Sequence, residues 1–250
     1  MKAIIIGAGR GKRLMPTTAD TPKCLAEVQG RSIMDWIVQA LAANGVERIA
    51  FVGGYQMEKV RARYPQFSFH HNADWENNNI LWSLMCAESE MDQPFVCCYS
   101  DTLFTADAVR RLVASPADIT LLVDTDWKAR YLHRTQHPPD DAEKVTAVNG
   151  TITRIHRMIE AELAHGEFTG MAKFSAAGAA TLREHYHRFR AAGASPKAYL
   201  IHLFQDMIER GVGMVHADTP GGYIEIDTQQ DFELAQAFSI AKSPNQKITK

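Results

Sequence analysis

The sequence predicts an α/β fold, in which a Rossmann-like, mostly parallel sheet is flanked by helices and carries a small antiparallel insertion. Short apolar runs alternate with amphipathic helical segments through the first half of the chain. The first run opens directly into a glycine-rich loop, which suits a phosphate-bearing ligand. A hairpin signal at Asn149-Gly150 then breaks the alternation. Because 250 residues suffice for one such domain, we expect a single domain over 1–241 and a polar tail over 242–250.

The N-terminal strand and its loop organise the chain. Ala3 to Ile6 is an apolar, mostly β-branched run that is typical of a buried strand. Glycine lets the following backbone approach a ligand closely, and its N–H donors suit phosphate oxygens. We therefore expect the loop to bind a polyanion, the alternative being a glycine-rich turn with solvated basic residues. The glycine segment holds Gly7, Ala8, Gly9 and Gly11, and the nearby cations are Arg10, Lys12, Arg13 and Lys23.

Two common glycine motifs do not fit this loop. A dinucleotide fingerprint counted from Gly7 would need its third glycine at Lys12. A P-loop would need a glycine at Ile6 and a hydroxyl residue at Arg13. The loop is therefore predicted to hold its polyanion in another way.

The next elements alternate between helix and strand, as expected for right-handed βαβ units. Helices are predicted from a Ser32 cap to about Ala43, at Gln56–Arg63, from Asn79 to about Met91, and at Ala106–Ala114. Strands are predicted at Arg48–Gly53, Phe67–His71, Pro94–Tyr99 and Asp118–Val123.

The second half is predicted to begin with an antiparallel insertion at about 124–175. It contains a hairpin, Lys144–Val148 with Thr151–Arg157, and a strand at Glu167–Phe174. Two amphipathic helices, two short strands and a last helix then complete the chain. These are Ala176–Ala192, Tyr199–Arg210, Gly213–Ala217, Tyr223–Ile226 and Gln229 to about Ala241.

Two carboxylates follow predicted strands. Asp101 ends a buried strand, at the edge of the sheet where ligands bind in open α/β folds. Asp227 ends the strand before the last helix. Mg²⁺ prefers one or two carboxylates together with phosphate oxygens, so both residues are candidate metal ligands. Each could instead cap the next helix, although Thr105 is available for that task after Asp101. Glu225 ranks lower because it should face the other side of its strand.

Asparagines gather before the third predicted helix. Asn72 is followed by the run Asn77-Asn78-Asn79, which is more than one helix cap requires, and by Ser83. An amide side chain offers both a donor and an acceptor, which suits the edge of a nucleobase. We interpret the cluster as base-reading, with a solvated capping cluster as the alternative.

The loop Gly-x-Gly-x-Gly-x-Arg-Leu-x-Pro, followed by Thr-Pro-Lys-Cys-Leu, closely resembles the signature of the sugar-phosphate nucleotidyltransferase superfamily. The resemblance implies that the glycine backbone and Arg13 hold the nucleotide triphosphate, with Lys23 beside the α-phosphate. It also implies that Asp101 and Asp227, in the segment Glu-Ile-Asp-Thr, bind Mg²⁺ together. Arg13 and Lys23 are accordingly the predicted catalytic residues.

The asparagine pattern Asn-Asn-x-x-x-Ser-Leu resembles the phosphocholine-type cytidylyltransferase branch, whereas the Gln-x-x-Pro-x-Gly loop of sugar transferases is absent. The resemblance implies that Asn78, Asn79 and Ser83 read cytosine. It further implies that the second substrate lies over the segment after residue 124. The predicted acceptor-binding residues are the cations Lys128, Arg130, Arg134 and Lys144, together with Glu167 of a Gly-Glu-x-x-Gly segment. Trp127 and Tyr131 could stack on an ammonium group. Each of these residues could equally be a surface charge or a core aromatic.

Composition restricts the partners. A net charge of −2 argues against nucleic acid, and no apolar run approaches the ~20 residues of a membrane span. The four cysteines show no metal-type spacing, and the N-terminus enters a strand without a signal peptide. These features predict a cytoplasmic enzyme with reduced thiols, and they leave a homo-oligomer open.

The leading hypothesis is a Mg²⁺-dependent cytidylyltransferase that joins CMP from CTP to a small phosphate- or phosphonate-bearing acceptor and releases pyrophosphate. Phosphocholine and 2-aminoethylphosphonate are plausible acceptors. The alternatives are a hexose-1-phosphate nucleotidyltransferase and a nucleotide-binding regulator without activity on the same fold.

Overall fold

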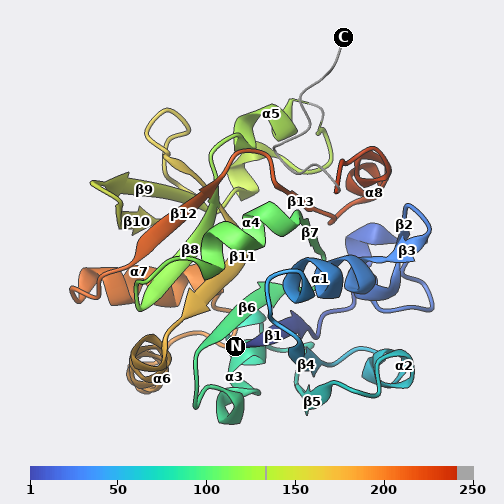
Figure 1. Ribbon diagram of the computed structural model, residues 1–250, viewed down its shortest axis with the longest axis horizontal. Coiled ribbons are helices and arrows are strands. Elements are labelled where there is room, and N and C mark those ends of the chain that lie inside the picture. Colours follow the sequence, from blue (N-terminus) through green and yellow to red (C-terminus); the bar gives the residue numbers. More distant parts are fainter. Residues whose placement is uncertain (133, 241–250) are drawn as a thin grey trace.

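The computed structural model describes residues 1–132 and 134–240, and within them the chain forms one nine-stranded sheet with helices on both faces (Figure 1). In spatial order the strands are β5 (Ser68–His71), β4 (Arg48–Gly53), β1 (Lys2–Gly7), β6 (Phe95–Tyr99), β11 (Gly166–Phe174), β8 (Ile119–Asp124), β12 (Val215–Thr219), β10 (Thr151–Ile155) and β9 (Lys144–Val148). The helices are α1 (Ile33–Ala42), α2 (Met57–Arg63), α3 (Ile80–Met85), α4 (Ala106–Val113), α5 (Trp127–Tyr131), α6 (Ala176–Ala191), α7 (Leu200–Glu209) and α8 (Gln229–Gln236).

The two sides of the sheet follow different pairing rules. Strands β5, β4, β1 and β6 run parallel to one another, as the βαβ alternation predicts. Beyond them β11 runs antiparallel to both β6 and β8, whereas β12 is parallel to β8. Strand β9 pairs with both β10 and β11. The strands β11, β8, β12, β10 and β9 therefore pair in a closed ring. The predicted α/β sheet is confirmed, and the antiparallel insertion continues the same sheet.

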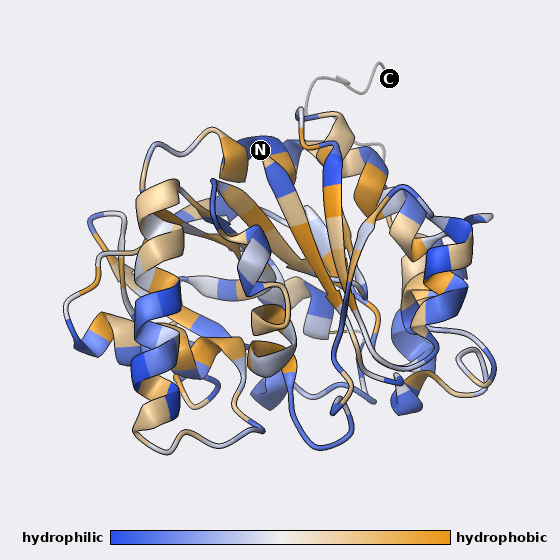
Figure 2. Cartoon of the chain, turned by 90° about the horizontal axis from the view of Figure 1, so that it is seen from below, coloured by the Kyte–Doolittle hydropathy of each residue, from blue (hydrophilic) through white to orange (hydrophobic). Residues whose placement is uncertain are grey.

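The core lies on both faces of the central strands. Along β1, Ala3 and Ile5 pack toward α1, α2 and α4, while Ile4 and Ile6 pack toward α3, α6 and α7. This is the period-two alternation of a strand that is buried on both sides. Figure 2 shows the apolar strands enclosed between helices whose outer faces are hydrophilic. Burying each large aliphatic side chain contributes about 1.5–3 kcal/mol, so β1 is a firm support for the loop that follows it.

Two small antiparallel pairs were not predicted. Strand β2 (Glu27–Val28) pairs with β3 (Arg31–Ser32), and β7 (Thr102–Phe104) pairs with β13 (Tyr223–Glu225). Strands of two or three residues are too short to show a hydrophobic period. The sequence pattern therefore could not reveal β2, β3 or β7, whereas β13 had been predicted as a strand without a partner. The short helix α5 was missed for the same reason.

Helix boundaries agree with the predictions where a cap defines them. Ser32 caps α1 as expected, because its Oγ accepts from the Asp35 N–H at 3.1 Å. The predicted third helix is shorter, since α3 ends at Met85 and a 3₁₀ turn follows. In that turn Glu90 accepts from Lys2 Nζ at 2.9 Å, which draws the segment toward β1. The predicted last helix also ends earlier, at Gln236, and the predicted tail over 242–250 lies outside the described residues.

Within the described residues, no helix combines the length and the apolar character that crossing a bilayer would need.

Candidate active site

A cavity of about 600 Å³ opens at the carboxyl ends of β1 and β6. The two strand ends are adjacent because the Ser100 N–H donates to the Ile6 carbonyl at 3.1 Å. Ligands bind at this edge in open α/β sheets. The cavity wall includes every residue to which the family resemblance gave a role at the nucleotide, in catalysis or at the metal, whereas Asn72 and Asn77 of the asparagine cluster do not line it. The residues with such a role are Gly7, Ala8, Gly9, Gly11, Arg13, Lys23, Asn78, Asn79, Ser83, Asp101 and Asp227.

The glycine loop forms one wall of the cavity. At two of its positions the structure shows why the residue is glycine. A Cβ on Gly7 would lie 2.6 Å from Ser100 Oγ and 2.8 Å from the Phe51 ring. Gly11 adopts a φ of 67°, in the left-handed region that side chains disfavour. At Gly9, an added Cβ would meet no atom of the described residues within 4 Å, so the backbone there faces open space. The loop therefore offers bare backbone to a ligand.

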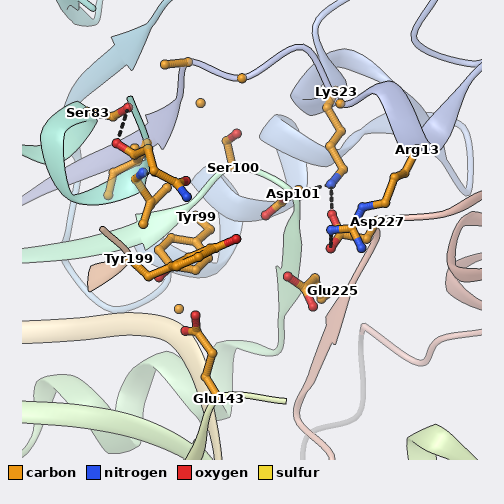
Figure 3. A pocket seen from close by; sticks show the side chains of 18 of the residues that line it. Arg13, Lys23, Ser83, Tyr99, Ser100, Asp101, Glu143, Tyr199, Glu225 and Asp227 are labelled. Atoms are coloured by element: carbon orange, nitrogen blue, oxygen red, sulfur yellow. Dashed lines mark hydrogen bonds and ion pairs between the residues drawn. The ribbon is translucent and has the colours of Figure 1, made fainter. Parts of the chain in front are cut away.

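Lys23 is the charge centre of the site. Its Nζ donates to Asp101 Oδ2 at 2.8 Å and to Asp227 Oδ1, and Arg13 Nη2 donates to Asp227 Oδ2 at 2.5 Å (Figure 3). Burial alone would lower the pKa of Lys23, but the charges of the two aspartates more than offset it and raise that pKa. Burial would raise the pKa of Asp227, yet Lys23 and Arg13 lower it below its ordinary value. Both groups are therefore held in their charged forms.

The unpredicted pair of β7 and β13 explains why the two aspartates meet. Asp101 directly precedes β7, and Asp227 closely follows β13. The strands run antiparallel with Glu225 opposite Thr102, and the Ile226 N–H donates to the Asp101 carbonyl at 2.9 Å. Two carboxylates more than a hundred residues apart in the chain are thereby fixed at one point.

The asparagine cluster forms a second wall. Asn72 and Asn78 exchange two amide hydrogen bonds, at 2.7 and 3.0 Å, and Asn72 also donates to Ser83 Oγ at 2.9 Å. Because each amide has two N–H groups and two lone pairs, Asn78 keeps one donor and one acceptor site for a ligand. Asn79 has a different role. Its Oδ1 caps α3 by accepting from the Ile80 N–H at 2.8 Å.

A row of alternating charges continues from Arg13 around the cavity. Asp141 lies 3.8 Å from Arg13 and 3.9 Å from Arg157, and Arg157 also lies 3.3 Å from Glu143. The Arg157 guanidinium stacks on the Tyr199 ring at 4.2 Å. In Figure 3, Tyr199 and Glu143 lie across the cavity from Lys23. Sequence reasoning missed these residues, because they lie at the edges of separate elements with no spacing in common.

Two buried carboxyl groups face this part of the cavity. Burial raises the pKa of Glu143 to about 7, and the charge of Arg157 opposes that rise only in part. Burial, Asp227 and Asp101 raise the pKa of Glu225 well above its ordinary value. Both carboxyl groups are therefore protonated more readily than usual, and a cationic ligand beside them would favour their charged forms.

The comparisons with known proteins identify the family. Residues 3–166 match the model of the MobA-like NTP transferase domain. The chain belongs to this family. It is a nucleotidyltransferase, and the resemblance found in its glycine loop is confirmed.

The relatives include cytidylyltransferases. The chain is 28% identical to a CTP:phosphoglutamine cytidylyltransferase of Campylobacter jejuni over 249 residues, which cover 94% of this chain and 98% of the relative. It is 36% identical over 100 residues to a 2-aminoethylphosphonate cytidylyltransferase of Lancefieldella rimae, covering 38% of this chain and 41% of the relative. Among solved structures, the inositol-1-phosphate CTP transferase of T. maritima matches with a TM-score of 0.76 at 22% identity over 97% of each chain. That likeness establishes the fold.

The nucleotidyltransferase site fits a divalent cation. Oxygens of Asp101 and Asp227 converge on one point, which the Lys23 ammonium shares. Within the described residues, Oδ1 of Asp101 is buried without a hydrogen-bond partner. Oxygens of Asp227 and Glu225 and a ring nitrogen of His137 also lie within 4.8 Å of one another. Carboxylate oxygens that face a phosphate-binding loop are the donors that Mg²⁺ prefers.

The predicted acceptor cations require correction. The nucleotidyltransferase cavity includes Glu167 in its wall but, among the described residues, none of Lys128, Arg130, Arg134 and Lys144. Arg130 binds Asp124 and Glu167, and Glu167 also accepts from Tyr131 Oη at 2.8 Å. These bonds hold Glu167 in the cavity wall, whereas Arg130 itself lies behind that wall and does not line the cavity.

The other three cations have structural or surface roles. Arg134 pairs with Asp231 at 2.8 Å and donates to the Glu225 carbonyl at 2.7 Å, so it holds β13 in place. Lys144 Nζ points toward the carbonyls of Pro139 and Ala142, at 3.4 Å each. Lys128 is exposed, with its Nζ 5.8 Å from the Trp127 ring. Trp127 and Tyr131 pack in a small core of their own and cannot reach an ammonium in the cavity.

Proposed function

We propose that this nucleotidyltransferase is a Mg²⁺-dependent cytidylyltransferase that transfers CMP from CTP to a small phosphate- or phosphonate-bearing acceptor. The observation that carries the proposal is the meeting of Asp101, Asp227 and Lys23 beside an exposed glycine backbone. The buried ammonium and the backbone N–H donors would neutralise and orient a triphosphate, and the two carboxylates would hold a Mg²⁺ ion that adds to the positive charge.

Relatives and local geometry support CTP as the nucleotide. The named activities of the Campylobacter and Lancefieldella relatives are both cytidylyl transfers. In this chain Asn78 keeps one amide donor and one acceptor site at the cavity wall, while Asn72 and Ser83 fix its orientation. A base edge that presents both a donor and an acceptor, as cytosine does, complements such an amide.

In the proposed reaction, an oxygen of the acceptor attacks the α-phosphorus of CTP and pyrophosphate leaves. A phosphate oxygen is ionised at neutral pH, so no enzyme nucleophile is needed. Lys23 and Arg13 would neutralise charge on the triphosphate, and the glycine N–H groups would orient it. Mg²⁺ held by Asp101 and Asp227 would supply further charge neutralisation at the α-phosphate.

We place the acceptor against Glu143, Arg157 and Tyr199. The guanidinium of Arg157 suits an anionic group, and its stacking on Tyr199 fixes the direction of its donors. The carboxyl of Glu143 suits a cationic nitrogen. Three relatives, the two described above and a choline-phosphate cytidylyltransferase of Streptococcus pneumoniae, act by name on phosphoglutamine, 2-aminoethylphosphonate and choline phosphate, which are small phospho-compounds that contain nitrogen. A nitrogen-containing acceptor is therefore the favoured class.

A substrate screen tests the proposal. The purified enzyme would be incubated with each of CTP, UTP, dTTP, ATP and GTP, and with phosphocholine, 2-aminoethylphosphonate, a phosphorylated amino acid or glucose 1-phosphate, while pyrophosphate release is followed. We expect turnover with CTP and a nitrogen-containing acceptor, and its loss on chelation of Mg²⁺. Preferential turnover of UTP or dTTP with glucose 1-phosphate would favour the hexose-1-phosphate reaction instead. Nucleotide binding with no turnover for any pair would favour the regulator.

A further inference from the structure

Three side chains that commonly bind metals meet outside the cavity wall. His165 directly precedes β11, whereas His216 and Asp218 lie on β12. Asp218 Oδ1 lies 2.9 Å from His165 Nε2 and 2.7 Å from His216 Nδ1. One potential ligand atom from each residue lies within 4.8 Å of the others.

The sheet itself brings these residues together. Strands β11 and β12 flank β8, and both register on the same part of it, since Phe168 and Asp218 each lie opposite Val123 (Figure 1). His216 and Asp218 are two residues apart on one strand, so they share a face. The His165 backbone is fixed by an N–H bond to the Val145 carbonyl at 2.8 Å. The cluster is therefore anchored on regular strands.

The chemistry of the three groups suits a transition metal. Two imidazoles and one carboxylate form a ligand set typical of Zn²⁺, whereas Mg²⁺ prefers oxygen ligands alone. The side chains of His165, His216 and Asp218 are 31%, 13% and 38% exposed, so water can reach the open coordination positions. Bonds of about 2.0 Å to a tetrahedral ion place ligand atoms roughly 3.3 Å apart, which requires only small rotations of the present hydrogen-bonded group.

We propose that His165, His216 and Asp218 bind one divalent transition-metal ion of the Zn²⁺ class, with water completing the coordination. The ion ties β11 to β12 across β8. Glu167, which lines the cavity, lies two residues after His165, so the ion stabilises the same part of the sheet that supports the acceptor side. The proposal does not depend on which reaction the cavity performs.

The test uses the full chain, stripped of metal and returned to a buffer with excess Mg²⁺, which loads the carboxylates of the cavity. Zn²⁺ is titrated by calorimetry, Co²⁺ is titrated by absorption in the visible range, and thermal unfolding is measured with and without Zn²⁺. We expect the wild type to bind one Zn²⁺ equivalent and to unfold at a higher temperature with the ion. His216→Ala and Asp218→Asn are expected to bind it at least ~100-fold more weakly.

A matched control is His187→Ala. His187 also pairs with a carboxylate, Glu88 at 2.7 Å, but among the described residues this pair belongs to no three-residue cluster of metal-binding side chains. It is expected to keep Zn²⁺ binding at the wild-type level. Asp218→Asn preserves the shape of the side chain, and its unfolding curve without Zn²⁺ shows that the fold is intact.

Zn²⁺ could instead bind in the cavity, where His137, Glu225 and Asp227 form a second candidate cluster. Zn²⁺ binding that survives in Asp227→Asn and is lost in His216→Ala supports the proposal. Binding that is lost in Asp227→Asn and kept in His216→Ala overturns it. So does a wild type that binds no Zn²⁺ under these conditions.

Discussion

The two sides of the cavity are assembled in different ways. On the nucleotide side, the glycine loop and Lys23 come from one continuous stretch of fewer than twenty residues, and Asn78 and Ser83 from one short segment. On the acceptor side, Asp141, Glu143, Arg157 and Tyr199 lie at or beside the ends of four different elements, a 3₁₀ turn, β9, β10 and α7. A continuous stretch carries its geometry in its own backbone, whereas scattered residues depend on the packing of the whole sheet.

This difference predicts which kinetic constant each variant changes, and for which of the two substrates. Changes at the metal and triphosphate groups should abolish turnover, because both substrates meet there. Changes on either side should raise the KM of one substrate only. The predictions below test that separation, in decreasing order of expected effect.

The largest effect is expected at the paired carboxylates. Asp101→Asn and Asp227→Asn should each lower kcat by about 10³-fold, because removing a charge-stabilising group from such a site costs about 3–4 kcal/mol in the transition state. Steady-state pyrophosphate release measures this. Asp107→Asn is the matched control, since Asp107 pairs with Arg110 and Arg111 on α4 and does not line the cavity. Turnover close to wild type in Asp227→Asn would contradict the proposed metal site.

Arg130→Met tests the corrected role of the predicted acceptor cations. Arg130 is buried between Asp124 and Glu167, so its removal leaves two buried carboxylates without their partner. Breaking such a group typically costs about 3–5 kcal/mol of unfolding free energy. Urea unfolding should show this loss, whereas the exposed Lys128→Met should leave stability unchanged. A stable Arg130→Met enzyme with a raised acceptor KM would restore the original prediction.

Arg157→Gln should raise the acceptor KM by about 10- to 100-fold, the value of a lost charge-assisted hydrogen bond of roughly 1.5–3 kcal/mol. The KM for CTP should stay within about twofold, because Arg157 lies on the acceptor side. The control Arg154→Gln removes an exposed arginine from β10, the strand that ends two residues before Arg157. Equal changes in both KM values would show that the two sides are not independent.

Asn78→Ala should raise the KM for CTP by about tenfold and leave the acceptor KM unchanged, because one or two neutral hydrogen bonds are lost. It should also narrow the preference for CTP over UTP in competition assays. Asn77→Ala provides the comparison, since the exposed Asn77 side chain bonds to Asp74 and does not line the cavity. An unchanged nucleotide preference would remove Asn78 from the base site.

The smallest effect is expected in the pH dependence of acceptor binding. Burial raises the pKa of Glu143 to about 7, so this carboxyl is mostly neutral at pH 6 and mostly charged at pH 8. Only the charged form attracts a cationic nitrogen, so kcat/KM for the acceptor should rise by up to about tenfold over this interval. Glu143→Gln should flatten that rise. A profile with the same slope in both enzymes would exclude Glu143 from acceptor recognition.

Prediction from the sequence succeeded where the signal was local. The run Ala3–Ile6 predicted a strand, and the glycines up to Gly11 predicted a loop that lines a site; the strand and the cavity-lining loop both lie where expected. Asp101 and Asp227 were found because each follows a strand, and strand ends meet at one edge of a sheet. Arg130 and Arg134 were misassigned, since a cluster of cations looks the same in sequence whether its charges face a ligand or buried carboxylates.

The sequence by itself determined the α/β class, the glycine loop and the acid groups at the strand ends, because periodicity and backbone freedom act over a few neighbouring residues. Only the tertiary structure decided that β7 pairs with β13, that Lys23 lies between two aspartates, and that Arg157 and Tyr199 meet at the cavity wall. Those contacts join residues far apart in the chain. Their geometry follows from how the sheet closes and how its helices pack, which no local pattern records.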